Sequence, residues 1–184
     1  MKRSLLALPL LALLSTGAFA ADGVSWNYVE GGYAATNTDS GDADGFALGG
    51  SAAIHPNFHL FGNYANQEIE DTDIDFDQWR LGVGYNHQIA PSADLVTRLA
   101  YEKFDAGNDL DFDGYSAEVG VRGAMTPMFE GYAMAGYEDF ELADGEFYGR
   151  VGAQVKFNPT WGVAGDVKFI DGDTQYFVGP RITW

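Results

Sequence analysis

The chain has 184 residues, no cysteine, and a formal net charge of −17 at pH 7 from 10 basic and 27 acidic residues. This balance excludes a nucleic-acid-binding protein, which needs a basic surface, and it opposes attraction to anionic lipid head groups. The lack of cysteine excludes disulfides, thiol chemistry and lipid attachment to an N-terminal cysteine. The 24 glycines and 27 aromatic residues (4 Trp, 10 Tyr, 13 Phe) are unusual for a soluble acidic domain and favour one that faces lipid.

Residues 1–20 predict a secretory signal peptide. Lys2 and Arg3 precede the apolar run Leu5–Leu14, and small residues end the segment at Ala18-Phe19-Ala20. This order is typical of export through the general secretory route, and the run is shorter than the about 20 residues of a transmembrane helix. We expect cleavage after Ala20 and a single mature domain over residues 21–184, with a net charge of 8 − 27 = −19.

Short proline turns alternate with acidic segments along the mature chain. The turns are His55-Pro56-Asn57, Ala90-Pro91-Ser92, Thr126-Pro127-Met128 and Asn158-Pro159-Thr160. The acidic, glycine-containing segments cover residues 37–44, 68–75, 105–113, 141–145 and 171–174. Alternating apolar residues flank each of them, which is typical of connections between strands. Nine connections predict ten strands in a hairpin meander. Eight strands are the alternative, which leaves one turn and one loop unexplained.

Apolar and polar residues alternate along the predicted strands. From Phe147 to Phe157, one face carries Val151 and Val155 and the other carries Arg150 and Gln154. A period of two predicts a sheet with one apolar face. The expected length of a membrane-spanning strand is about 9–11 residues. Ten such strands leave enough of the mature chain for the nine connections.

Aromatic residues indicate which way the apolar face points. They cluster at both ends of the strands, mostly eight residues apart, at Phe58, Tyr64, Trp79, Tyr85, Phe129, Tyr137, Phe147, Phe157, Trp161, Phe169, Tyr176 and Trp184. Eight residues of a tilted strand span roughly 20 Å, which approximates the apolar band between the aromatic girdles of an outer-membrane barrel. The apolar face is therefore predicted to face lipid. Because lipid tolerates no unpaired strand edge, the sheet is predicted to close into an antiparallel transmembrane β-barrel.

The polar face must then line the lumen, where acids and bases have to pair. The predicted lumen charge network is Arg80, Arg98, Glu102, Glu118, Arg122, Glu130, Arg150, Asp166, Lys168 and Arg181. A barrel of this strand number has little spare interior. A lumen filled by ion pairs is therefore favoured, and a narrow or gated pore is the alternative. The facing of Tyr28, Glu30 and Gly32 on the first strand is left open.

The C-terminal stretch Tyr176-Phe-Val-Gly-Pro-Arg-Ile-Thr-Trp184 resembles the last strand of small outer-membrane barrels of Gram-negative bacteria. This resemblance implies an assembly signal formed by Tyr176, Val178, Ile182 and Trp184. It also implies two groups of partners during biogenesis, the barrel-assembly machinery and periplasmic chaperones.

Three stretches near the mature N-terminus, SWNYVEGGY, TDSGDADGF and GSAAIHPNFHLFG, resemble a xanthomonad family. That family is named for a proposed activation of plant immunity and is linked to diffusible-signal-factor regulation. The similarity is strongest before residue 90. It implies an outer-membrane barrel with proposed roles in motility, biofilm or virulence.

The three histidines offer no external catalytic site. His55, His59 and His87 all lie in or beside proline turns. Short turns of such barrels face the periplasm and longer loops face the exterior. An outer-membrane enzyme needs a positioned group, commonly histidine, at the external rim. We therefore predict that the protein is not an enzyme.

The stretch DLDFDG, from Asp109 to Gly114, looks like the start of a calcium loop. An EF-hand needs a bidentate glutamate at its twelfth position, which here is Gly120, so an EF-hand is excluded. A solvated, self-repelling rim is favoured. Weak binding of calcium or magnesium is left open at Asp71, Asp73, Asp75, Asp109, Asp111 and Asp113. No other cofactor is expected, and such cations would reconcile the rim with the phosphates of lipopolysaccharide.

These observations favour an integral outer-membrane barrel of structural or surface-interaction type, surrounded by lipid and lipopolysaccharide in a Gram-negative bacterium. A narrow channel for small solutes is the first alternative. A soluble, exported ligand-binding barrel is the second. The sequence names no external partner.

Overall fold

A computed structural model describes residues 21–38, 41–72, 74–107, 111–141 and 144–184. These residues form ten strands: β1 (Tyr28–Thr38), β2 (Gly41–His55), β3 (Phe58–Ile69), β4 (Asp75–Ala90), β5 (Ala93–Asp105), β6 (Asp111–Thr126), β7 (Phe129–Phe140), β8 (Glu146–Lys156), β9 (Trp161–Ile170) and β10 (Asp173–Thr183). No helix in these ranges is long and apolar enough to cross a membrane.

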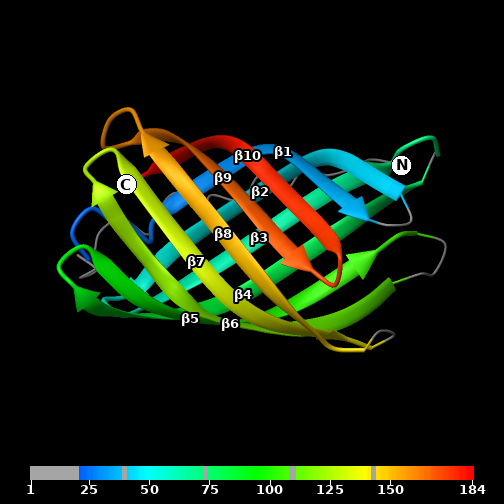
Figure 1. The fold of residues 1–184 in the computed structure, drawn as a ribbon, viewed down its shortest axis with the longest axis horizontal. Helices are drawn as coiled ribbons and strands as arrows, with labels where there is room; N and C mark the ends of the chain where they lie inside the picture. Colours follow the sequence, from blue (N-terminus) through cyan, green and yellow to red (C-terminus); the bar gives the residue numbers. More distant parts are fainter. Residues whose placement is uncertain (1–20, 39–40, 73, 108–110, 142–143) are drawn as a thin grey trace, which may run out of the picture.

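The strands form a closed antiparallel barrel in which sequence neighbours are also spatial neighbours (Figure 1). The first and last strands close it, with β1 paired to β10 from Tyr28–Thr183 to Asn37–Thr174. Every strand therefore has a hydrogen-bonding partner on both sides. The prediction of ten strands in a closed meander is confirmed, and the alternative of eight strands is wrong.

The four proline turns and the C-terminus lie at one end of the barrel, on the left in Figure 1. A β-bulge precedes each of the first three turns, at Ala53/His55, Gln88/Ala90 and Ala124/Thr126. Bulges terminate strand pairing, and the following proline lacks the N–H that would continue it. At the fourth turn the Asn158 side chain instead accepts hydrogen bonds from the amides of Thr160 and Trp161, at 2.9 and 2.8 Å.

The strands extend further at the opposite, acidic end than the sequence predicts. β2 has 15 residues and both β4 and β6 have 16. Asp111 and Asp113, expected in a loop, therefore lie on β6, and the predicted loop 37–44 is largely strand. Strand pairing continues here because an extended ladder satisfies the backbone in water as well as in lipid.

Phenylalanines support this extension from inside. Phe76, Phe104, Phe112 and Phe140 lie on four successive strands, β4 to β7. Their ring centroids are 5.0, 4.8 and 6.0 Å apart in that order. Along each strand the phenylalanine alternates with charged residues that face outward. The acidic segments therefore have charged side chains outside and a row of phenylalanines inside.

The outer face of the barrel is apolar. Leu81, Leu99 and Phe147 are 68%, 63% and 83% exposed. Nine of the twelve predicted girdle residues are also exposed there: Phe58, Trp79, Tyr85, Phe147, Phe157, Trp161, Phe169, Tyr176 and Trp184. The other three, Tyr64, Phe129 and Tyr137, are partly covered by neighbours. The residues of the predicted assembly signal lie on β10 and at its end, with Val178 also exposed and Ile182 partly covered.

Candidate functional site: a charged and plugged lumen

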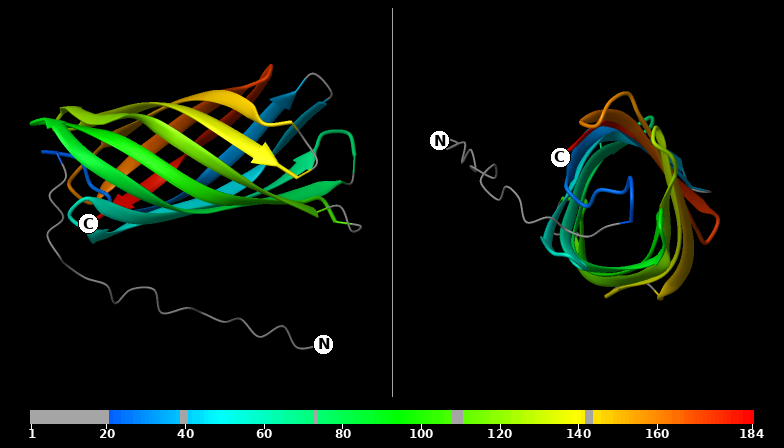
Figure 2. Two further views of the ribbon diagram at one scale, coloured as in Figure 1. Left: turned by 90° about the horizontal axis from the view of Figure 1, so that it is seen from below. Right: turned by 90° about the vertical axis from the view of Figure 1, so that its left-hand side faces the viewer.

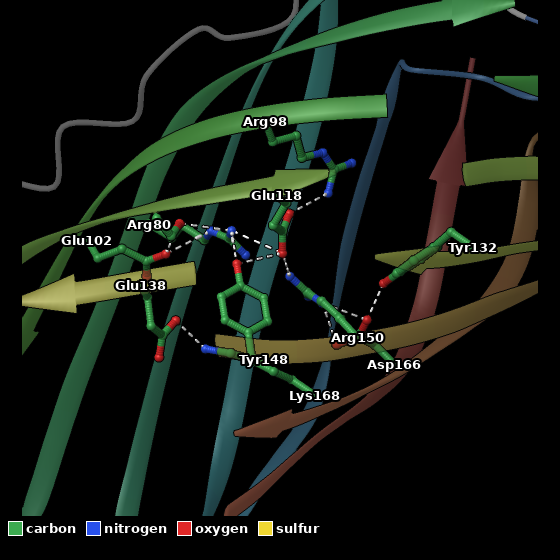
Figure 3. A network of polar contacts seen from close by, with 11 residues as sticks. Arg80, Arg98, Glu102, Glu118, Tyr132, Glu138, Tyr148, Arg150, Asp166 and Lys168 are labelled. Atoms are coloured by element: carbon green, nitrogen blue, oxygen red, sulfur yellow. Dashed lines mark hydrogen bonds and ion pairs between the residues drawn. The ribbon is translucent and has the colours of Figure 1, made fainter. Parts of the chain in front are cut away.

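Glu118 on β6 lies at the centre of a charge cluster in the middle of the lumen (Figure 3). Its fully buried carboxylate lies 3.1 Å from Arg80 and 3.8 Å from both Arg98 and Arg150. The Tyr148 hydroxyl donates a further hydrogen bond to it, at 3.0 Å. One carboxylate thus joins three guanidinium groups from β4, β5 and β8.

Two further carboxylates balance the cluster. Glu102 lies 3.0 Å from Arg80, and Asp166 accepts two hydrogen bonds from Arg150 Nε, at 2.9 and 2.8 Å. The Tyr132 hydroxyl also donates to Asp166. Three arginines therefore face three acids, as buried charges require. The cluster is thus neutral overall, with its charged groups paired across the central lumen.

The remaining predicted lumen residues form separate pairs. Arg181 contacts Glu30 at 2.6 Å, which shows that the first strand turns Glu30 inward. Lys168 pairs with Glu138. All ten predicted residues face the lumen, but they divide into a central cluster and smaller groups.

Near the proline-turn end, Glu130 is bound by two cations. Arg122 forms an ion pair with it, and Lys156 lies 3.0 Å away. The lumen set predicted from the sequence omits Glu30, Glu138 and Lys156. The alternation that places Glu130 and Arg150 inward also places Glu138 and Lys156 inward, so strand parity could have found them.

Several glycines make room for the large lumen side chains. A Cβ at Gly84 would lie 2.1 Å from the His59 ring, and one at Gly136 would lie 2.3 Å from Tyr148. Likewise, a Cβ at Gly152 would meet Tyr132 at 2.4 Å. These glycines are needed for close approach and not for an unusual backbone conformation.

The Gly84→Ala substitution is expected to destabilise the barrel by about 1–3 kcal/mol, because overpacking against a buried ring cannot relax. His59 cannot move aside, since it is fully buried and stacked. The check is the urea midpoint of the refolded protein. Gly149→Ala is the matched control, because a Cβ there meets nothing within 4 Å. Equal midpoints for the two variants would contradict the packing explanation.

Residues 21–27 enter the lumen at the proline-turn end and plug it (Figure 2, right). Trp26 is 1% exposed and stacks on His59 with ring centroids 4.1 Å apart. The guanidinium carbons of Arg122 and Arg98 lie 4.4 and 5.8 Å from the centre of the Trp26 ring. This plug was not predicted, because the segment has no strand alternation. Its Asp22-Gly23 dipeptide signals a turn, which the Val24 amide closes on the Ala21 carbonyl at 3.0 Å, but such a signal does not indicate entry into the lumen.

Hydrogen bonds hold the plug to several parts of the wall. The Asp22 amide donates to the Pro91 carbonyl at 2.8 Å, and Arg122 donates to the Ser25 carbonyl at 3.0 Å. The Asn27 side chain accepts from the Ala53 amide at 2.8 Å. The segment is thus bound to β2, to β6 and to the β4–β5 turn.

A cavity of about 140 Å³ remains beside the central cluster. Its polar lining includes Glu30, Asn63, Gln67, Lys168 and Arg181. A water molecule occupies about 30 Å³ of the liquid, so the space suits a few waters. This cavity is the observation that favours the alternative of a narrow channel.

Acids at the opposite rim are spread out. Asp71 lies in the β3–β4 connection, and Asp75, Asp111 and Asp113 lie on strands, whereas Asp73 and Asp109 fall outside the described residues. Within the described part of the chain, no three acidic or histidine side chains gather in a way that could hold a metal ion. Asp111 is instead paired with Lys103 at 2.9 Å.

Acidic neighbours perturb one rim carboxyl, Glu146. Partial desolvation and the nearby carboxylate of Asp171 raise its pKa. Repulsion between acids therefore acts at Glu146, while a self-repelling rim as a whole stays a prediction.

Two tyrosines near the acidic end of the barrel donate hydrogen bonds to outward-facing acids. The Tyr64 hydroxyl donates to Asp77 at 2.7 Å, and Tyr115 donates to Asp139 at 3.0 Å. These carboxylates lie on the outer face of the barrel, between the aromatic girdle and the acidic end. They are thus placed where the apolar surface gives way to charge.

The histidines lie where the sequence predicts. His55 and His87 are exposed near the proline turns, and His59 is buried against the plug. All three are at the proline-turn end of the barrel.

No protein-family model matches the chain, and no curated protein sequence matches it. Among solved structures it is similar to the KdgM porin, with 12% identity, a TM-score of 0.47 and coverage of 85% of this chain and 99% of that one. It is also similar to the translocator domain of the autotransporter NalP from Neisseria meningitidis (11%, 0.48, 90% and 91%). The third is Ail, the attachment invasion locus protein of Yersinia pestis (13%, 0.42, 88% and 100%). The xanthomonad resemblance stays a prediction.

Proposed function

We propose that the protein is an integral outer-membrane barrel of structural or surface-interaction type with a closed lumen. The apolar outer face supports the assignment to a membrane, because a face of this kind would be unstable in water. The predicted signal peptide and C-terminal assembly signal support export to the outer membrane.

The central cluster carries the proposal of a closed lumen. Glu118 on β6 is fully buried between arginines from β4 and β8, two strands away on either side. The plug closes the proline-turn end. Opening a path would separate paired charges in a poorly hydrated interior, which is costly. The barrel therefore presents its outer surface and its rim as the functional parts.

Single-channel recording tests the closed lumen. Purified protein in planar bilayers is expected to give no stepwise conductance, while a porin in the same membrane gives clear steps. A narrow channel is the second candidate, because the cavity beside the cluster is lined by charged and amide groups. Reproducible steps from the wild-type protein would support the channel and reject the closed barrel.

Cell fractionation separates both candidates from a soluble barrel. We expect the protein in the outer-membrane fraction, with a gel mobility that changes on heating. A soluble fraction without a mobility change would reject the membrane assignment. The proposed roles in motility, biofilm or virulence rest on sequence resemblance, and a deletion strain assayed for each would test them.

The acidic rim leads to a prediction about divalent cations. Outward acids such as Asp77 and Asp139 lie beyond the girdle, at the level where lipopolysaccharide phosphates would meet them. Millimolar calcium is expected to raise the melting temperature of protein reconstituted with lipopolysaccharide, because a hard cation binds both kinds of oxygen. Calorimetry checks this, with the D77N/D139N double variant as the control. An equal shift in both proteins would contradict it.

A further inference from the structure

We propose that removal of the signal peptide completes the plug. The new α-ammonium group of Ala21 forms a buried ion pair with Asp94, so that the plug locks only in the mature chain. This inference goes beyond the proposed function and rests on cleavage after Ala20.

The Asp94 carboxylate already accepts hydrogen bonds from the backbone nitrogen of Ala21. Asp94 is the second residue of β5 and is fully buried. The Ala21 nitrogen lies 3.3 and 3.4 Å from its two carboxylate oxygens. Trp26 Nε1 donates to the same carboxylate at 3.2 Å, which joins the two ends of the plug at one acid.

Asp94 lacks a cationic partner in the rest of the described chain. No lysine, arginine or histidine in the described ranges forms an ion pair with it, whereas Glu118 and Glu130 have several such partners. Neutral N–H donors satisfy hydrogen bonds without neutralising the charge, and an uncompensated buried carboxylate is costly. Arg122 lies opposite Asp94 on β6, but its guanidinium is paired with Glu130. Asp94 therefore lacks a positive charge in direct contact with its carboxylate.

Cleavage supplies that charge at the same atom. Hydrolysis by signal peptidase breaks the Ala20–Ala21 peptide bond, adds the hydroxyl of water to the Ala20 carbonyl carbon and leaves a proton on the Ala21 nitrogen. The amine then takes a proton from solvent, because free α-amino groups have a pKa of about 7.7–8.0. A single N–H donor becomes a cation with three donors, facing both oxygens of Asp94.

The burial of Ala21 points the same way. It is 1% exposed and belongs to the apolar cluster with Val24, Trp26, Val96 and Met134. A terminal residue is normally frayed unless something holds it. Here the apolar cluster and the carboxylate hold it together.

The test uses protein purified from outer membranes, whose N-terminus is first determined by mass spectrometry. The α-amine is then labelled with an amine-reactive ester near neutral pH, in the folded protein and in urea. We expect labelling to be about tenfold or more slower in the folded protein, because reaction requires the plug to open. In the D94N variant, labelling should approach the rate in urea, while exposed Lys103 serves as an internal reference in every sample.

A second variant keeps Asp94 and moves the amine. One glycine inserted before Ala21 displaces the new ammonium by about 3.5 Å and leaves the barrel unchanged. We expect this chain to melt at a lower temperature than the mature protein. We also expect greater acrylamide quenching of Trp26, measured with the outer-face residues Trp79, Trp161 and Trp184 changed to phenylalanine.

Three results would overturn the proposal. One is a mature chain that begins at a residue other than Ala21. This result would reject the ion pair without contradicting the proposed function of the barrel. Another is a folded, heat-modifiable protein whose α-amine reacts at the rate in urea. The third is a glycine-extended chain with the melting temperature and quenching of the mature protein, and this result is decisive even if D94N does not fold.

Discussion

Replacing Glu118 by glutamine is expected to lower the free energy of unfolding by about 3–5 kcal/mol, because it leaves buried charges without their partner. Glutamine has nearly the same shape, so the change isolates the charge. It would leave Arg80, Arg98 and Arg150 facing one another with only Glu102 and Asp166 at the edges of the cluster. The measurement is the urea-dependent loss of the fast-migrating folded form on a gel.

Lys103→Gln is the matched control for this experiment. It also breaks an ion pair, with Asp111, but the two side chains are 36% and 51% exposed. Exposed pairs contribute about 1 kcal/mol or less, so this variant should unfold close to the wild-type midpoint. Similar losses in both variants would show that Glu118 does not hold the cluster together.

Replacing Trp26 by alanine is expected to destabilise the barrel by about 3–5 kcal/mol, the usual cost of deleting a large buried aromatic side chain. The change removes the stack on His59 and the ring beneath the Arg122 guanidinium. It should also admit water to the proline-turn end of the lumen. Urea unfolding measures the first effect, and faster hydrogen exchange of the amides of residues 21–27 measures the second.

Trp161→Ala controls for the loss of a tryptophan. Trp161 begins β9 and is 50% exposed on the outer face, where lipid or detergent fills the space that alanine leaves. We expect a smaller loss of stability and no change in exchange of the plug amides. If the two variants exchanged alike, the plug would not depend on Trp26.

The strand parity of the barrel is local information, which is why it could be predicted. A period of two places Arg150 and Val151 on opposite faces without knowledge of the partner strands, and the aromatic residues at the strand ends predict that the face of Val151 points outward. The proline turns likewise mark strand ends by their chemistry. The extension at the acidic end was missed because aspartates disfavour strands, and the inner Phe76, Phe104 and Phe112 row that supports it forms only across strands.

Ion-pair partners depend on register and on how the barrel curves. Arg98 lies directly opposite Glu118 on the neighbouring strand, yet their charged atoms are 3.8 Å apart. Arg80, two strands away, approaches Glu118 more closely, at 3.1 Å. Strand neighbours alone would therefore name the wrong principal partner.

The sequence by itself determined the strand number, the end of the barrel with the proline turns and, beyond the first strand, which face points inward. These follow from turn residues, from alternation along single strands and from the aromatic residues at the strand ends. Only the tertiary structure decided that residues 21–27 fill the lumen and that Asp94 receives both Ala21 and Trp26. That segment has no period of its own. Its place depends on a cavity that exists only once β1 and β10 have paired and closed the barrel.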